Sequence, residues 1–196
     1  MKLIEVEQYT KKRFFKELKP IYVYHSLNHT IDVVNSAERI ARLESVSVEE
    51  ITLIKTAAYL HDIGILVQFK EHEKHSVSVA KEILPGFGYN SNHIEVIIGL
   101  IHSTQMPQVA NSILQQIICD ADLDYLGRDD YFDISLLLRK EWSKLFKKEY
   151  SHCQWYMSQK TFLCNHVYHT ASVREMRNEK KMENILKVQS LLDDLM

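Results

Sequence analysis

The sequence almost lacks the residues that interrupt helices, and this constrains the fold more than any other feature. The chain of 196 residues contains only 5 Gly and 3 Pro, whereas a protein of short strands and tight turns needs both at many positions. Between these few breaks, apolar residues recur at intervals of three and four, as at Ile31, Val34, Ala37 and Ala41. This is the period of an α-helix with one buried face. We therefore expect an all-α fold.

Capping and breaking signals divide the chain into successive helices. Pro20 follows the first helix, Ser47 and Glu50 form a capping box at the start of the third, and Pro85-Gly86 ends the fourth. We expect helices over roughly 3–18, 27–43, 47–62, 72–84, 91–102 and 112–122, and two or three more within 130–196.

The length of the chain suits one domain, or one domain with an extension. We find no repeat, low-complexity tract or linker. We predict a single domain, 1–196, with a compact core over about 22–130 and a C-terminal helical extension over about 131–196. The aromatic residues of the extension, among them Trp142 and Phe162, are expected to pack against the core rather than to stack on nucleic-acid bases.

Charge and cysteine content exclude several classes of protein. The formal net charge is -2, which gives no general attraction to nucleic acid or anionic membranes. The three Cys form no C-x-x-C pair, as in proteins of a reducing compartment. The N-terminus has no apolar segment typical of a signal peptide, and the apolar run at 96–101 is too short to span a bilayer. We expect a cytoplasmic protein with no nucleic-acid or membrane partner.

An imidazole and a carboxylate follow one of the most apolar stretches of the chain. His61 and Asp62 come directly after the run Ala57–Leu60, and no Lys or Arg follows until Lys70. A buried carboxylate needs a cationic partner, and a metal ion would meet that need. Other ligand-type side chains lie near the ends of other predicted helices, which can converge at one pole of a bundle: His29, His72, His102 and Asp122.

Five segments occur in an order that is typical of one family. YHSLNHTIDVV, AAYLHDIG, HEKHS, IHST and CDADLDYLG together resemble the H…HD…D signature of the HD-domain superfamily of metal-dependent phosphohydrolases, over roughly residues 22–130. The resemblance implies a compact HD-type helical bundle. It also implies one metal ion held by His29, His61, Asp62 and Asp122. The binuclear members use two more histidines, which His72 and His102 match, and their equivalent of Asp62 bridges both ions.

Several neighbouring residues compete for these roles. His75 lies one turn after His72, and we favour His72 because Ser76 matches a small residue of the family. Asp120 and Asp124 compete with Asp122, which has the family's Ala-Asp-Leu context, and Asp120 could instead orient a ligand histidine.

Other candidates are weaker. Arg128 is the basic residue nearest in sequence to bind a substrate phosphate, with Arg174 and Arg177 as alternatives. No catalytic acid or base is assigned, although Glu73 is a candidate. The remaining histidines lack motif support and are interpreted as surface or core residues: His25, His93, His152, His166 and His169.

The chemistry that the resemblance implies is metal-assisted hydrolysis of a small phosphorylated molecule, either a nucleotide or another phosphomonoester or phosphodiester. One or two divalent ions, of Fe, Mn, Zn, Co, Ni or Mg, would lower the pKa of a bound water and offset charge on the phosphoryl oxygens. The Gly-Tyr-Pro signature of the cyclic-di-nucleotide phosphodiesterases is absent.

Two other functions stay open. Some members of the superfamily hold two irons with a similar ligand set and activate oxygen. A degenerate HD domain can also act as a sensor or scaffold, although an intact ligand set argues against this. The oligomeric state is open, a homo-oligomer included.

Overall fold

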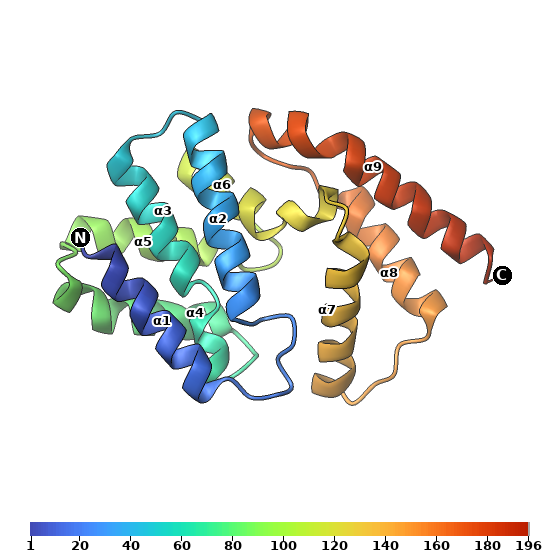
Figure 1. Ribbon diagram of the computed structural model, residues 1–196, viewed down its shortest axis with the longest axis horizontal. Coiled ribbons are helices and arrows are strands. Elements are labelled where there is room, and N and C mark those ends of the chain that lie inside the picture. The colour runs from blue at the N-terminus through green and yellow to red at the C-terminus, as the bar shows by residue number, and fades with distance from the viewer. Residues whose placement is uncertain (196) are drawn as a thin grey trace.

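The computed structural model describes residues 1–195 and consists of helices joined by short loops (Figure 1). In that range there are no strands, so the predicted all-α fold is confirmed. The α-helices are α1 (Leu3–Glu17), α2 (Leu27–Leu43), α3 (Val48–Leu60), α4 (His72–Ile83), α5 (Ser91–Ser103), α6 (Ile113–Asp122), α7 (Tyr131–Leu145), α8 (His152–Asn165) and α9 (Ala171–Asp193). Three short 3-10 segments link them: η1 (Ile63–Leu66), η2 (Leu84–Phe87) and η3 (Asp124–Gly127).

The predicted capping box starts α3. The Glu50 amide donates to Ser47 Oγ over 3.2 Å, and the Ser47 amide donates to the Glu50 carboxylate over 2.8 Å. These bonds satisfy two of the amides that an α-helix leaves unpaired at its start. They fix where α3 begins, and therefore also where His61 falls at its end.

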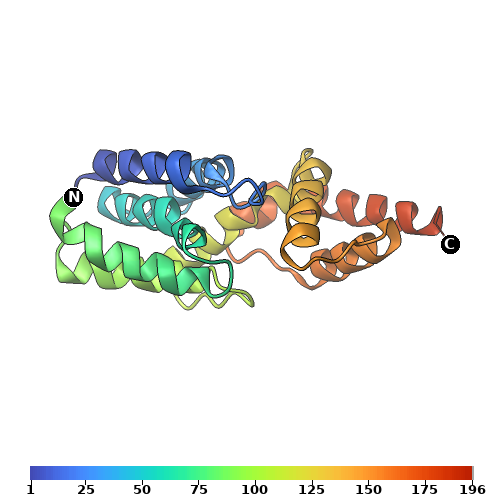
Figure 2. The ribbon, with the colours of Figure 1, turned by 90° about the horizontal axis from the view of Figure 1, so that it is seen from below.

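Helices α1 to α6 form the larger part of the molecule, at the left of Figures 1 and 2. Helix α2 packs against α3 and α6, and α3 packs against α5. Ile40, Ile54, Leu60 and Ile97 are completely buried where these helices meet. Burial of each such side chain contributes about 1.5–3 kcal/mol. This common core fixes the ends of α2, α3 and α6 relative to one another.

Helices α7 to α9 lie to the other side, so the molecule is elongated from its N-terminal to its C-terminal helices (Figure 2). Helix α9 packs on α8 and on η3. The buried Asp124 carboxylate accepts hydrogen bonds from Arg39 of α2, over 2.9 Å, and from Arg177 of α9, over 2.8 Å. This pair of contacts ties the C-terminal helices to α2.

The predicted extension ends at residue 196, which lies outside the described residues. Within residues 1–195, none of the helices is both long enough and apolar enough to cross a bilayer.

Candidate metal centre

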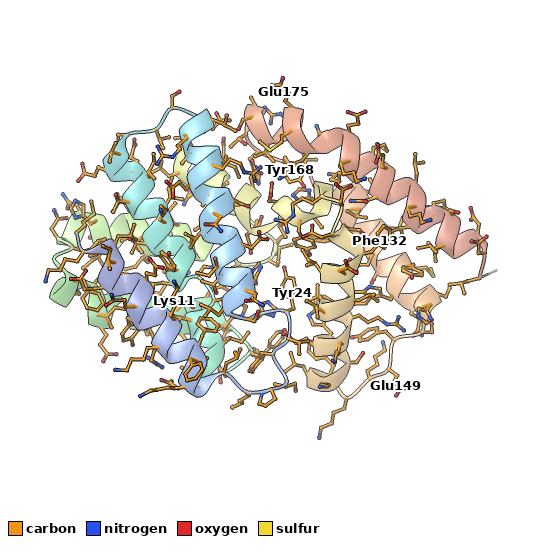
Figure 3. The ribbon with its side chains drawn as sticks, viewed as in Figure 1. Lys11, Tyr24, Phe132, Glu149, Tyr168 and Glu175 are labelled. Atoms are coloured by element: carbon orange, nitrogen blue, oxygen red, sulfur yellow. The ribbon has the colours of Figure 1, made fainter. Side chains whose placement is uncertain are left out.

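Three of the predicted ligands meet where α2, α3 and α6 come together. His29, His61 and Asp122 each offer a ligand atom, and these atoms all lie within 4.8 Å of one another. His29 Nε2 is 3.2 Å from Asp122 Oδ1 and 3.4 Å from His61 Nε2. The ring of Tyr24, which is labelled in Figure 3 beside the lower end of α2, stacks on His29 with centroids 4.8 Å apart. This contact holds the imidazole against the cluster.

The carboxylate of Asp62 faces this group with one oxygen and a fourth ligand with the other. Asp62 Oδ2 lies 3.2 Å from His61 Nε2 and 3.5 Å from His29 Nε2. Asp62 Oδ1 lies 3.1 Å from His72 Nε2, at the start of α4. The structure thus brings together five of the six residues predicted as ligands: His29, His61, Asp62, His72 and Asp122.

The local backbone explains how the neighbours His61 and Asp62 face the same point. Successive residues of a regular helix project about 100° apart. The α-helix ends at Leu60, Asp62 adopts φ -105° and ψ 1°, and the chain continues as the 3-10 segment η1. This change of conformation turns the Asp62 side chain toward the cluster. Gly64 then lets η1 lie directly on α4, because a Cβ at that position would be only 2.0 Å from the His72 carbonyl oxygen.

Backbone carbonyls fix the tautomers of two imidazoles. His61 Nδ1 lies 2.8 Å from the Ala58 carbonyl oxygen, and His72 Nδ1 lies 3.0 Å from the Phe69 carbonyl oxygen. A carbonyl only accepts hydrogen bonds, so each Nδ1 carries the proton. In the neutral imidazole the lone pair is therefore on Nε2, which faces the carboxylates and can take up either a proton or a metal ion. Metal-binding histidines are oriented in this way.

The electrostatics of the cluster favour added positive charge. Burial opposes ionisation of Asp62, but the imidazoles of His61 and His72 outweigh it and hold the pKa of its carboxyl well below the usual value. Burial opposes ionisation of Asp122 too, yet hydrogen bonds from His29 and His61 lower its pKa to about 2. Burial lowers the pKa of His72, but the hydrogen bond to Asp62 raises it to about 9. At neutral pH both carboxylates are ionised and attract either protons or a cation.

The surroundings of one buried atom indicate that this arrangement fits a metal ion. Asp62 is 4% exposed, and within residues 1–195 its Oδ2 atom has no hydrogen-bond partner. An ionised oxygen in that state is costly unless a cation is close. The same oxygen faces the Nε2 atoms of His29 and His61. The donor set of imidazole nitrogens and carboxylate oxygens therefore fits a divalent transition-metal ion.

Two of the predicted site residues lie apart from the cluster. The side chain of His102 is exposed near the end of α5 and does not line the cavity beside Asp62. The guanidinium of Arg128 donates to Asp32, over 2.8 Å, and to Asp130, over 2.6 Å, and it also lies outside the cavity. Arg128, which was predicted to bind a substrate phosphate, is therefore already paired with two carboxylates.

The competing residues have other partners in the structure. Asp120 accepts hydrogen bonds of 2.7 Å from the amides of His169 and Thr170, so it holds the start of α9 instead of orienting a ligand histidine. Asp124 binds arginines, as described above, and Arg177 is one of them. Arg174 donates to backbone carbonyls of the loop before α9.

His25, which lacks motif support in the sequence, lines the cavity beside Asp62 and His72. Glu141 of α7 is completely buried and accepts hydrogen bonds from the amides of Tyr24 and His25, over 2.9 and 3.1 Å. It also binds His25 Nδ1. The ring of His25 lies 5.5 Å from that of His72, centroid to centroid. Its position one turn before His29 in the sequence was a signal, but its partner is 116 residues away.

A cavity of about 820 Å³ opens beside the cluster. One side is built from the core, with Asp62 and His72, and the other from the C-terminal helices, with Trp142, Gln159 and Phe162. Phe162 packs against the core, as predicted for the aromatic residues of the extension, and both Trp142 and Phe162 also line this cavity. A cavity of this size accommodates a small organic ligand.

Parts of this sequence match known proteins. A family model described as HD domain matches residues 26–124. An uncharacterized protein of Clostridium beijerinckii is 37% identical over 89 residues, which make up 44% of this chain and 55% of that protein. The guanosine-5'-triphosphate,3'-diphosphate pyrophosphatase of Pseudoalteromonas translucida is 30% identical over 73 residues, 34% of this chain and 15% of that protein. The chain thus spans about half of the first relative and a small part of the second.

Bacillus subtilis YpgQ, solved in complex with ADP, has the same fold over nearly the whole chain. The alignment covers 98% of this chain and 97% of that one, with a TM-score of 0.68 and 16% sequence identity. The C-terminal helices α7 to α9, which lie beyond the matched residues 26–124, therefore belong to the shared architecture as well.

Proposed function

The chain belongs to the HD domain family, and on that premise we propose that it is a metal-dependent phosphohydrolase. The observation that carries the proposal is the buried Oδ2 atom of Asp62, which lacks a hydrogen-bond partner in residues 1–195 and faces two imidazole nitrogens. The substrate is a small phosphorylated molecule. The ADP bound by YpgQ and the named activity of the Pseudoalteromonas relative favour a nucleotide.

His29, His61, Asp62 and Asp122 would hold the first ion. When bound, a divalent ion lowers the pKa of a coordinated water and offsets negative charge on phosphoryl oxygens. Imidazole ligands favour Fe, Mn, Zn, Co or Ni over Mg. The backbone carbonyls of Ala58 and Phe69 keep the ligand imidazoles of His61 and His72 in the tautomer that such an ion requires.

A second ion would have fewer ligands from this chain. Asp62 Oδ1 and His72 Nε2 face each other over 3.1 Å, and Glu73 Oε1 lies 3.6 Å from the same nitrogen. The exposed His102 does not join them. We therefore expect the first ion to bind more tightly than the second. This arrangement also disfavours the di-iron oxygenase hypothesis, which needs two complete ligand sets.

His25 is proposed as the proton donor to the leaving oxygen. Its Nδ1 is occupied by Glu141, so its Nε2 is the nitrogen available on the wall of the cavity. An imidazole that is held through Nδ1 can pass a proton from Nε2 to a leaving oxygen, as a general acid does. Two backbone amides also donate to Glu141 and hold its carboxylate beside His25.

Elemental analysis of the purified protein tests the proposal. The wild type is expected to retain at least one transition-metal ion per chain, and Asp62→Ala close to none, with the helical circular dichroism of both preserved. Asp133→Ala, which removes an exposed carboxylate from α7, is the matched control and should retain the metal. A screen of nucleotides and sugar phosphates then measures phosphate release.

The alternatives predict different results. A folded wild type that binds no metal, even after incubation with Mn²⁺, Fe²⁺ or Zn²⁺, would exclude the enzyme and favour a scaffold. Two irons per chain with oxygen consumption, but no release of phosphate from any substrate, would favour the oxygenase.

A further inference from the structure

We propose that α7 and α8 form a nucleobase-binding subsite in which Gln159 selects a base with a keto oxygen. This subsite adds to the proposed function, and it depends on that function only for the phosphate end of the ligand. Its basis is a buried amide that the proposed chemistry does not use. Gln159 is only 5% exposed, yet it lines the same cavity as Asp62 and His72.

The two halves of the Gln159 amide have different surroundings. Its Oε1 atom accepts hydrogen bonds from the hydroxyls of Tyr131, over 3.1 Å, and Ser135, over 3.2 Å. Its Nε2 atom, by contrast, donates to no acceptor within residues 1–195, and it is not among the fully enclosed polar atoms that lack a partner, so it is open to the cavity that Gln159 lines. A ligand that fills the cavity displaces water from this nitrogen, and its binding is favoured when the ligand itself supplies the acceptor.

Trp155 fixes which end of the amide faces the cavity. Its Nε1–H donates to Ser135 Oγ over 3.0 Å, and an indole nitrogen can only donate. The hydroxyl proton of Ser135 is therefore directed to Gln159, where only the amide oxygen can accept it. A flipped amide would direct its NH₂ group at Ser135 and lose the hydrogen bonds that Oε1 accepts from the hydroxyls of Tyr131 and Ser135. The chain of hydrogen bonds thus keeps the two N–H donors of Gln159 available to a ligand.

A fixed pair of donors discriminates between bases. A keto oxygen, as at position 6 of hypoxanthine and guanine, can accept from Nε2. An exocyclic amine at the same position, as in adenine, brings donor against donor, and Nε2 then loses the acceptor at position 6. Sites built around a specific hydrogen bond reject the analogue that lacks it, because the buried group then stays unpaired.

Planar apolar surfaces lie beside the amide. Phe162 follows Gln159 by three residues and so lies on the same face of α8. Phe162, Trp142 of α7 and Phe69 of the loop before α4 all line the cavity. Stacking of a base on an aromatic side chain is sequence-tolerant and strengthens binding by roughly tenfold or more. Stacking therefore provides affinity for a base, and Gln159 provides the choice among bases.

Calorimetric titration with nucleosides tests the subsite without any phosphate chemistry. Inosine and adenosine differ at position 6 of the purine, and ribose lacks the base. Wild type is expected to bind inosine about fivefold more tightly than adenosine, because this ratio corresponds to the contribution of one neutral hydrogen bond. Ribose should bind more weakly than either nucleoside. Gln159→Met keeps the length of the side chain but removes both donors, and it should lose the preference for inosine.

Two further variants separate selection from folding. Ser135→Ala keeps Gln159 but removes the hydroxyl that fixes the amide, so the ratio of inosine to adenosine affinity should fall toward one. Gln116→Met, on α6 and outside the cavity, is the matched control and should bind as wild type does. If Gln159→Met does not fold, Ser135→Ala decides.

Equal binding of inosine, adenosine and ribose by wild type would overturn the proposal, as would an unchanged preference in Ser135→Ala. Because nucleosides carry no phosphate, this outcome is independent of metal content and phosphate release. A protein that releases phosphate but does not discriminate nucleosides would keep its proposed function and lose this subsite. The reverse result would keep the subsite and exclude the hydrolase.

Discussion

A single added methyl group at Gly64 should both destabilise the protein and weaken its metal binding. Gly64 lies in η1, between the pair His61-Asp62 that follows α3 and the first turn of α4. A Cβ on this residue would lie 2.0 Å from the His72 carbonyl oxygen, 2.6 Å from the Ser76 amide nitrogen and 2.8 Å from His75 Cβ. Ordinary contacts of a carbon atom begin at about 3.5 Å. Two of the three clashing atoms are backbone, so no rotamer change can relieve them.

The magnitude follows from the movement that Gly64→Ala requires. Segment η1 and α4 have to separate by more than about 1 Å to restore ordinary contact. Overpacking a core typically costs about 1–3 kcal/mol, and backbone clashes favour the upper end. For a chain of this size, about 3 kcal/mol lowers Tm by roughly 6–12 °C. The same separation breaks the 2.8 Å hydrogen bond from the Gly64 amide to Ser76 Oγ and lengthens the 3.1 Å contact between Asp62 and His72.

Thermal unfolding followed by circular dichroism measures the first effect, and metal content after dialysis measures the second. Gly86→Ala is the matched control, because a Cβ there meets nothing within 4 Å, and its Tm and metal content should equal those of wild type. A Gly64→Ala variant with the Tm and metal content of wild type would refute the claim that close contact between η1 and α4 assembles the ligands.

Two other perturbations address residues outside the ligand set. Glu141→Gln removes the charge that supports His25, so kcat for the substrate found in the phosphate-release screen should fall by about 100-fold, whereas metal content should not change. If kcat is unchanged, His25 is not the proton donor. Burial, with the charge of Lys181 3.3 Å away, lowers the pKa of His166 to about 3. As the pH falls, His166 is therefore protonated in the unfolded chain before it is protonated in the folded protein. The free energy of unfolding consequently decreases below about pH 6.5. Between pH 6.5 and 5.5, wild type should lose about 1 kcal/mol more of its free energy of unfolding than His166→Asn in urea titrations, and an equal loss in both proteins would contradict the burial of a neutral imidazole.

The fold could be predicted from local signals because helices depend on residues near in sequence. The capping box at Ser47 and Glu50 lies within four residues, and it marks the start of α3 in the structure as in the sequence. The stop at Pro85-Gly86 is also local, since proline removes a helical donor. These signals delimit each helix, but they do not say how one helix packs against another.

The ligand cluster was predictable for a different reason. His61 and Asp62 combine polar groups with a strongly apolar neighbourhood, which is unfavourable without a partner. The resemblance to a family then supplied the residues that lie far away in sequence. It also suggested His102, whereas Arg128 was chosen for its closeness to Asp122 in sequence. Neither signal indicates the exposure of a side chain or a competing partner. In the structure His102 is exposed, and Arg128 is bound by the carboxylates of Asp32 and Asp130.

What the sequence could not indicate is how the C-terminal helices complete the cavity. Glu141 meets His25 across 116 residues, and Gln159 depends on Tyr131, 28 residues before it. Neither contact has a periodicity or a motif, because each depends on where α7 and α8 pack against the core. These residues also lie beyond the family match at 26–124. The proposed nucleobase subsite therefore depends on α7 and α8, and the substrate of this protein has to be sought in side chains that the family signature does not include.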